Sequence, residues 1–302
     1  MKWEEEQKAI RNLIIEKNSF DWDLTSLDLV AGVDISAAKK DTDVACAALV
    51  IYSLKMKTAL YEEVEMFNIS HQPYIPGFLA FREVPVLIKL FERLKQKQPK
   101  LWPELVMVDG NGILHTNQCG LACHLGVLLD LPTLGVGKTL FYFDGLTKDK
   151  VKLQCEKDIK EPGDISLLVG DSGKAWGAAV RNSKGAVNPI FVSVGHKIEL
   201  KIAVDIVIKL SEFRVVEPIR LADKKSRELV ESWKGNKGEL PTGGSSKTYP
   251  TSSAQRPLSI NIHIASYNAR EKIKHKKFAT KTPKKNRYST LKSKNTDLFI
   301  TY

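Results

Sequence analysis

Two aspartates interrupt segments that are otherwise apolar, and they are the first candidates for chemistry. Asp34 stands in VAGVDIS, and Asp109 ends the continuously apolar run in ELVMVDGNG. Burying an unpaired carboxylate costs several kcal/mol, so each side chain must face a cleft or a cation. The alternative is that each aspartate caps the turn that follows it. For one such residue the cap is the better interpretation, but two at neighbouring strand ends favour a metal site.

A third acid, Glu83, lies at the start of a long amphipathic segment and completes a set of three hard oxygen ligands. Such a set suits Mg²⁺, or Mn²⁺ in its place, because these ions keep several waters and take further ligands from phosphate oxygens. The sequence therefore predicts phosphodiester chemistry, in which the metal lowers the pKa of an attacking water and neutralises the phosphate. His196, in FVSVGHKIEL, could orient or deprotonate that water, although a lone histidine after a strand is more often a structural hydrogen-bonding group.

The order of periodic segments predicts the scaffold that positions these acids. Apolar or alternating runs at residues 29–36, 44–54 and 59–69 resemble an antiparallel meander of three strands. A helix follows, with apolar positions at helical spacing: Val84, Leu87, Ile88, Phe91 and Leu94. Strands and helices then alternate, which implies parallel strands with crossover helices on the sheet faces. We predict an α/β fold with an RNase H-like mixed central sheet flanked by helices.

The net charge of +11 is concentrated at one end of the chain. Fifteen of the 46 Lys and Arg but only four of the 35 Asp and Glu lie from Glu231 onward, so residues 1–230 carry 31 charges of each sign. We predict a catalytic domain over residues 1–232 and a disordered basic tail over 233–302, because the polar tail cannot bury enough apolar surface to offset its ordering entropy. The tail is either a phosphate-binding arm, a nuclear or nucleolar address, or a solubilising extension.

Composition argues against a membrane protein and against a secreted one. The chain has 43% hydrophobic residues, but no run of eighteen or more could span a bilayer. The N-terminal sequence MKWEEEQKAI is acidic where a secretory signal needs an apolar run, so we expect a cytoplasmic and nuclear monomer. Cys119 and Cys123 lie four residues apart, but no second Cys or His pair follows at zinc-finger spacing, which favours small buried residues.

Several longer segments together resemble the endonuclease V family. The resemblance covers residues 10–230, and its motifs occur in the family's order. They are PYIPGFLAFREVP at 73–85, VDGNGILH at 108–115, LACHLGVLLDLPTLGVGK at 121–138, VSVGHKIEL at 192–200 and EPIRLADKKSRE at 217–228. One departure is GVGK where the family usually has GVAK, which removes one methyl group from the turn before Lys138.

The resemblance implies an RNase H-like nuclease that cleaves a strand 3′ of inosine or deoxyinosine and leaves 3′-hydroxyl and 5′-phosphate ends. Asp34, Glu83 and Asp109 match the family's metal-binding acids. His196 matches a histidine near the metal, and Lys138 matches the lysine of the GVAK segment. The motifs are most similar to those of animal members, so the expected partner is inosine-containing single-stranded RNA, with deaminated DNA as a second candidate.

Further residues are expected to contact the substrate. Tyr74, between Pro73 and Ile75, matches the wedge residue that the family inserts at the lesion, where a flat ring can fill the gap left by a rotated base. A packed loop aromatic is the alternative interpretation. The loop after Asp109 could recognise hypoxanthine through backbone groups that glycine leaves accessible. Its candidate residues are Gly110, Gly112, Ile113, Leu114 and His115, of which the last could instead hold the loop by hydrogen bonding.

Two other functions remain open. An inactive nucleic-acid-binding relative would share the fold but could lose an acid, and the presence of Asp34, Glu83 and Asp109 together argues against it. A structure-specific nuclease of RNase H-like fold would share the acids but would have no reason for PYIPGFLAFREVP. Cleavage of inosine-containing and unmodified strands side by side would separate the three.

Overall fold

The computed structural model describes residues 2–38, 43–70, 75–183, 188–233 and 244–249. They belong to one compact unit, Met1–Ile264, whereas a second unit, Ala265–Tyr302, lies outside the described residues. The helices are α1 (Lys2–Arg11), α2 (Ala80–Lys97), η1 (Pro99–Leu101), α3 (Leu121–Leu129), α4 (Lys148–Asp158), α5 (Leu200–Lys209) and α6 (Glu217–Ser232). The strands are β1 (Leu29–Ala37), β2 (Val44–Ser53), β3 (Thr58–Asn68), β4 (Leu105–Asp109), β5 (Thr133–Gly137), β6 (Ile165–Val169), β7 (Ala175–Val180), β8 (Ile190–His196) and β9 (Ser245–Thr248).

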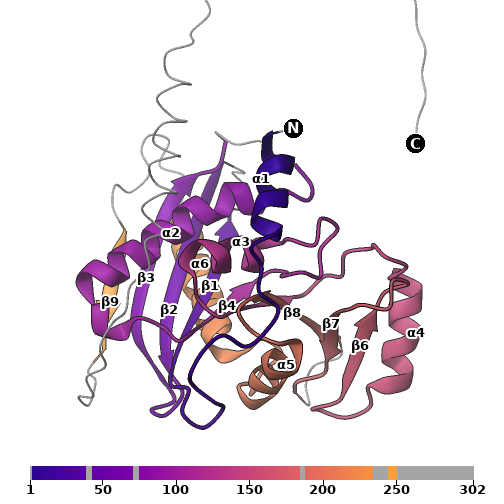
Figure 1. Ribbon diagram of the computed structural model, residues 1–302. Coiled ribbons are helices and arrows are strands. Elements are labelled where there is room, and N and C mark those ends of the chain that lie inside the picture. The colour runs from indigo at the N-terminus through magenta and orange to yellow at the C-terminus, as the bar shows by residue number, and fades with distance from the viewer. Residues whose placement is uncertain (1, 39–42, 71–74, 184–187, 234–243, 250–302) are drawn as a thin grey trace, which may run out of the picture. The chain divides into compact units, whose positions relative to one another are not determined.

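These strands form a single mixed sheet in the order β6-β7-β8-β5-β4-β1-β2-β3-β9 (Figure 1). The strands β1, β2 and β3 make the predicted antiparallel meander, and β4 and β5 then add in parallel to β1. On the far side of β5, the strands β8, β7 and β6 are antiparallel. The predicted α/β fold, a mixed central sheet flanked by helices, is confirmed. None of the described helices is long and apolar enough to cross a membrane.

Helices cover both faces of the meander, and the alternation of side chains along β2 shows why. Ala47, Leu49 and Ile51 belong to the buried cluster that includes the apolar face of α2. The intervening residues Cys46 and Ala48 point to the opposite face, where they pack with α6. Figure 1 shows α2 crossing in front of these strands and the orange α6 behind them. A strand buried on both faces must be apolar, as β2 is from Val44 to Ile51.

Gly32 sets how closely α6 approaches β1. A Cβ atom at this position would lie 2.1 Å from the backbone carbon and oxygen of Pro218, in the first turn of α6. Any side chain would therefore push the helix away from the strand. This close contact matters because β1 and α6 both carry residues of the site described below.

Two parts of the structure differ from the sequence-based prediction. Residues 245–248 fall within the predicted disordered tail, yet they form β9, which pairs antiparallel with β3 through Val64↔Ser245 to Tyr61↔Thr248. The unpaired edge of β3 offers backbone donors and acceptors that a polar segment can satisfy without an apolar face of its own. Helices α1 and α4 were not predicted, because each buries few side chains; in α4 only Val151 is buried.

Candidate metal centre and active site

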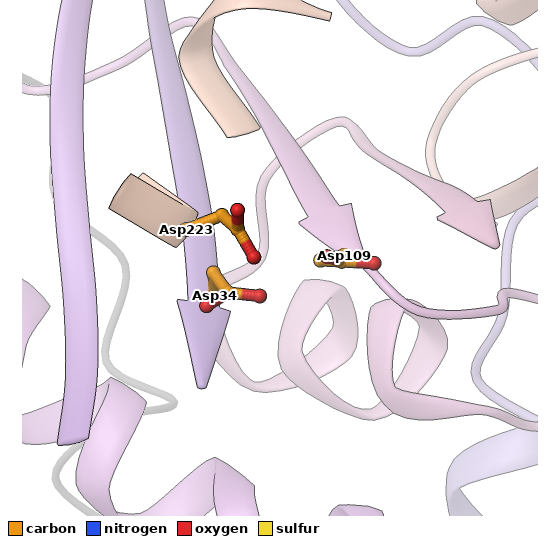
Figure 2. Close-up of side chains that lie close together, drawn as sticks. All are labelled: Asp34, Asp109 and Asp223. Carbon is orange, nitrogen blue, oxygen red and sulfur yellow. The ribbon is translucent and has the colours of Figure 1, made fainter. Parts of the chain in front are cut away.

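Three aspartates from distant parts of the chain meet at one point of the sheet. Asp34 lies on β1, Asp109 ends β4, and Asp223 lies on α6. The parallel register, in which Val33 pairs with Val108, places the two strand residues side by side. One carboxylate oxygen from each of the three residues lies within 4.8 Å of the others, and Figure 2 shows the three side chains close together. Among the described residues, this is the arrangement of acids that could hold a metal ion.

Serine hydroxyls fix the position of the Asp34 carboxylate. Ser226 Oγ, on α6, donates to Asp34 Oδ2 at 2.6 Å, and Ser36 Oγ donates to the same oxygen at 3.2 Å. Burial raises the pKa of Asp34 to about 7, and the negative charges of Asp109 and Asp223 raise it further, whereas the Ser226 hydrogen bond acts to lower it. The carboxylate is therefore held in place by hydroxyl groups, and no ion pair with a described Lys or Arg compensates its charge.

Glu83, in the first turn of α2, faces the same negative field. Burial raises its pKa to about 8, and the charges of Asp34 and Asp109 add to this effect, against a smaller opposing contribution from Arg82. Its oxygens are not among those that lie within 4.8 Å of one another. The structure therefore brings the third predicted acid near the aspartates, but the tight triad contains Asp223 in its place.

Two cations border the triad. Lys138, directly after β5, places its Nζ 2.5 Å from Asp109 Oδ2. Arg227 donates to Asp223 Oδ1 at 2.7 Å from one turn further along α6. The side chain of Lys138 is 35% exposed, so a phosphate entering from solvent could reach its ammonium group. A cation at the edge of an acidic cluster is suited to draw in a polyanion that the acids alone would repel.

His196 does not lie with these acids. It pairs with Thr133 at the start of β5, whereas Asp109 pairs with Val136, three residues and roughly 10 Å further along that strand. The backbone N–H of Ile15 donates to His196 Nδ1 at 3.3 Å. Burial, with help from Lys197, lowers the pKa of His196 to about 4. The structure therefore does not bring His196 to the aspartates, where it was predicted to orient or deprotonate a water at the metal. This imidazole is neutral at pH 7 and anchors the segment after α1.

The loop after β4 is built into the protein interior. The N–H of Gly112 donates to Ser193 Oγ at 2.9 Å, and the N–H of Ile113 donates to Val194 O at 2.8 Å. A Cβ atom on Gly112 would lie 1.9 Å from Val194 O, so the glycine serves this close packing against β8. The two backbone donors predicted to recognise hypoxanthine are already used inside the protein, because the loop packs on the sheet instead of lining an open surface.

The remaining residues of this loop also have internal contacts. Leu114 is fully buried. His115 packs edge-on against Phe141 with ring centroids 4.8 Å apart, and its Nδ1 accepts from the N–H of Asn117 at 3.2 Å. Burial lowers its pKa to about 4. These contacts support the alternative given for His115, which is to hold the loop. Gly110 adopts a φ of 152°, a conformation that favours glycine directly after Asp109.

The predicted wedge falls at the edge of the structural description. Pro73 and Tyr74 lie outside the described residues. Ile75 is the first residue described after them, and its carbonyl accepts from the N–H of Phe78 at 3.0 Å in the turn before α2. The same turn leads to Glu83, so the PYIP segment joins directly to an element of the site.

Asp223 is the site residue that sequence reasoning missed. It lies in the EPIRLADKKSRE motif, where it looks like one of several charges on the solvent face of an amphipathic helix. A signal was present one turn later, because Ser226 occupies a fully buried position in the stripe formed by Ile219 and Ala222. A serine in the apolar stripe of a helix needs a hydrogen-bond partner, and here the partner is Asp34.

Comparisons with known proteins agree with this geometry. The sequence profile of the endonuclease V family matches residues 8–224. Endonuclease V of Homo sapiens is 40% identical over 260 residues, which cover 85% of this chain and 89% of the human one. The crystal structure of human ENDOV superposes with a TM-score of 0.72 at 40% identity and covers 76% of this chain and 97% of that chain. Endonuclease V of Ciona intestinalis, solved in complex with a 24mer DNA containing an inosine followed by a ribo-adenosine, gives a TM-score of 0.72 at 33% identity, over 76% of this chain and 97% of that one.

Proposed function

Because this chain belongs to the endonuclease V family, we propose that it is a Mg²⁺-dependent endonuclease that cleaves a phosphodiester bond 3′ of inosine in RNA. The proposed products carry 3′-hydroxyl and 5′-phosphate ends, and deoxyinosine in DNA is the second proposed substrate. Family membership makes the chain a nuclease of a family that typically uses a divalent metal. The proposal adds three finer statements: that the metal is Mg²⁺, that the preferred sugar is ribose, and that the cleaved bond lies 3′ of inosine.

The observation that carries the proposal is the convergence of Asp34, Asp109 and Asp223. Three carboxylates this close repel one another. Burial is the main cause of the raised pKa of Asp34, and the negative charges of Asp109 and Asp223 raise it further. A protein gains nothing in stability from such an arrangement unless a cation joins it. Hard carboxylate oxygens without sulfur or imidazole are the donor set that Mg²⁺ and Mn²⁺ prefer.

We assign the metal to the three aspartates, with Glu83 as a neighbouring acid that can hold a metal-bound water. When bound, the metal would lower the pKa of a water and neutralise charge on the scissile phosphate. The described residues supply the remaining positioning. Ser226 and Ser36 hold Asp34 in a fixed orientation, and Lys138 attracts the phosphate to the exposed side of Asp109.

Recognition of inosine in this proposal depends on a base that leaves the stack. Hypoxanthine offers a carbonyl acceptor and a ring N–H donor where adenine offers an amino donor and a ring nitrogen acceptor, so a small set of polar groups can separate the two. Tyr74 is the proposed wedge that fills the vacated space. The Ciona relative was solved with an inosine followed by a ribonucleotide, and this supports inosine as the lesion and a ribose at the next position.

The test compares single-stranded RNA and DNA oligonucleotides that carry one inosine with matched adenosine controls, each with Mg²⁺ and with a chelator. We expect cleavage only of the inosine strands, only with metal, and faster in RNA. The Asp223→Asn protein, which keeps the side-chain shape but removes the carboxylate charge, is the matched inactive control. Equal cleavage of the adenosine strands would instead favour a structure-specific nuclease, and binding without cleavage would favour an inactive nucleic-acid-binding relative.

A further inference from the structure

A cavity of about 780 Å³ adjoins the candidate metal centre on the side away from β1. It lies between the segment after β5, the helix α4, and the strands β7 and β8. We call this cavity the basic pocket. Its charged lining residues are Lys138, Lys148, Lys152, Glu156, Arg181 and Arg214. Five cations against one acid make this a strongly positive concave surface, although residues 1–230 as a whole are electrically neutral.

Lys138 connects the basic pocket to the acids. Its side chain lines the pocket, and its Nζ contacts Asp109 Oδ2 at 2.5 Å. A chain of phosphates that reached Asp109 would therefore meet the mouth of the pocket within one or two nucleotides. Concave surfaces of one sign focus the electrostatic field and raise the local concentration of the opposite charge.

The cations beyond Lys138 are of two kinds. Lys148 and Lys152 lie on α4 as exposed side chains, and the latter is only 3.8 Å from Glu156, a loose ion pair at best. Arg181 and Arg214 are held in place, since Arg181 donates to Lys160 O and Arg214 Nε donates to Asn188 O at 3.2 Å. Fixed guanidinium groups beside mobile ammonium groups suit a flexible phosphate backbone.

The floor and rim of the basic pocket can also take a base. Leu140, Val151, Ile159 and Phe191 supply apolar lining. Tyr142 also lines the pocket and has 56% of its surface exposed, so its ring is accessible to a base from solvent. Grooves that bind single strands combine cations along the backbone with aromatic rings on which bases stack. Duplex recognition needs no exposed ring, because paired bases are already stacked.

We propose that the basic pocket binds the single-stranded stretch of the nucleic-acid substrate next to the cleaved bond, with phosphates on Lys148, Lys152 and Arg214 and one unstacked base on Tyr142. This inference rests on the proposed function, and it assigns a binding subsite to residues outside the acidic triad. Its consequence is a substrate length requirement on one side of the lesion only.

The experiment uses the full chain and fluorescein-labelled RNA with one inosine, extended by about 4 to 10 nucleotides on either the 5′ or the 3′ side. Affinity is measured by anisotropy with a chelator present, so that no cleavage occurs. The test variants are Lys148→Ala with Lys152→Ala, and Tyr142→Ala beside Tyr142→Phe. The charge-matched control is Lys157→Ala with Lys201→Ala, two exposed lysines of α4 and α5 that do not line the pocket.

Each lysine–phosphate contact contributes a factor of about 5 to single-strand affinity at about 0.1 M salt, so the double lysine variant should weaken binding roughly 25-fold and lower the salt slope by about 1.4. Tyr142→Ala should weaken binding at least about fivefold, and Tyr142→Phe should restore it, because the ring does the stacking. The wild type should gain affinity from extension on one side, and the lysine variant should lose that gain. Melting temperatures should stay unchanged, because all of these side chains are exposed.

Wild-type affinity in the pocket variants, or an equal loss in the charge-matched control, would overturn the proposal. The same data separate it from the proposed function. If inosine strands are cut but pocket variants bind normally, the pocket assignment fails and the nuclease assignment stands. If the wild type cuts no inosine strand but its RNA affinity still depends on Lys148, Lys152 and Tyr142, the pocket assignment stands alone.

Discussion

The metal-free protein should lose stability as the pH rises through neutrality. Asp34 and Glu83 have pKa values raised to about 7 and about 8, whereas in the unfolded chain both would titrate near their ordinary values of 3.8 and 4.5. A carboxyl group with a raised pKa in the folded protein favours folding at low pH, and the benefit is lost as the pH rises toward the folded-state pKa. The stability of the apo protein should therefore fall until about pH 8.

Two histidines have the opposite effect at lower pH. Burial lowers the pKa of His115 and of His196 to about 4, against an ordinary value of 6.5. The unfolded chain then binds more protons than the folded one between about pH 4 and 6.5, so these residues stabilise the fold as the pH rises through that window. Above pH 6.5 their contribution is constant, and among the described groups with shifted pKa values Asp34 and Glu83 set the slope.

The size of the effect follows from the remaining pH interval. Above pH 6.5, Glu83 loses its stabilising effect over about 1.5 pH units, up to its pKa, and Asp34 over about 0.5 pH units. Together these intervals lower the free energy of unfolding by roughly 3 kcal/mol. For a domain of this size, 1 kcal/mol shifts the melting temperature by about 2–4 °C. We therefore expect the melting temperature to fall by roughly 5–10 °C over this interval.

Thermal unfolding with a chelator, measured at intervals from pH 6.5 to 8, tests this expectation. Glu83→Gln should remove most of the slope, because a neutral amide does not titrate, and Asp34→Asn should remove the smaller remainder. Saturating Mg²⁺ should flatten the curve for the wild type, since a bound cation offsets the repulsion. A metal-free melting temperature that is constant or rises over the interval would refute the reasoning, as would an unchanged slope in Glu83→Gln.

Three substitutions give further tests. Asp223→Asn should lower the single-turnover cleavage rate roughly 100-fold or more without lowering the melting temperature, whereas Asp205→Asn, a surface acid on α5, should leave the rate unchanged. Gly32→Ala should destabilise the protein by about 1–3 kcal/mol in urea unfolding and should slow cleavage, because the added methyl group would displace Pro218 and with it α6. Wild-type values in both assays would contradict this packing. Lys138→Ala should raise KM for the substrate roughly fivefold at about 0.1 M salt, yet it should lower the Mg²⁺ concentration that gives half-maximal activity. If KM and this Mg²⁺ concentration both rose or both fell, the assigned role of Lys138 would be contradicted.

The strand meander, the long helix and the positions of two acids could be predicted from the sequence because each depends on local pattern. Periodicity over nine to eighteen residues identified β1, β2, β3 and α2, and an acid that ends an apolar strand is visible without knowing its neighbours. The family resemblance rested on the same kind of contiguous motif. These features needed no knowledge of which segments pack together.

Tertiary packing decided what no local pattern contains. Asp223 lies 189 positions after Asp34 in the chain, and it reaches the site only because Gly32 lets α6 pack directly on β1. His196 ends a strand, as a catalytic histidine could. The antiparallel register of β8 with β5 places it beside the first residue of β5, whereas Asp109 lies beside the far end of that strand. A strand pattern fixes which side chains share a face but not the direction in which a neighbouring strand runs. The close contact between α6 and β1 places Asp223 beside the other two aspartates. The antiparallel direction of β8 places His196 away from them.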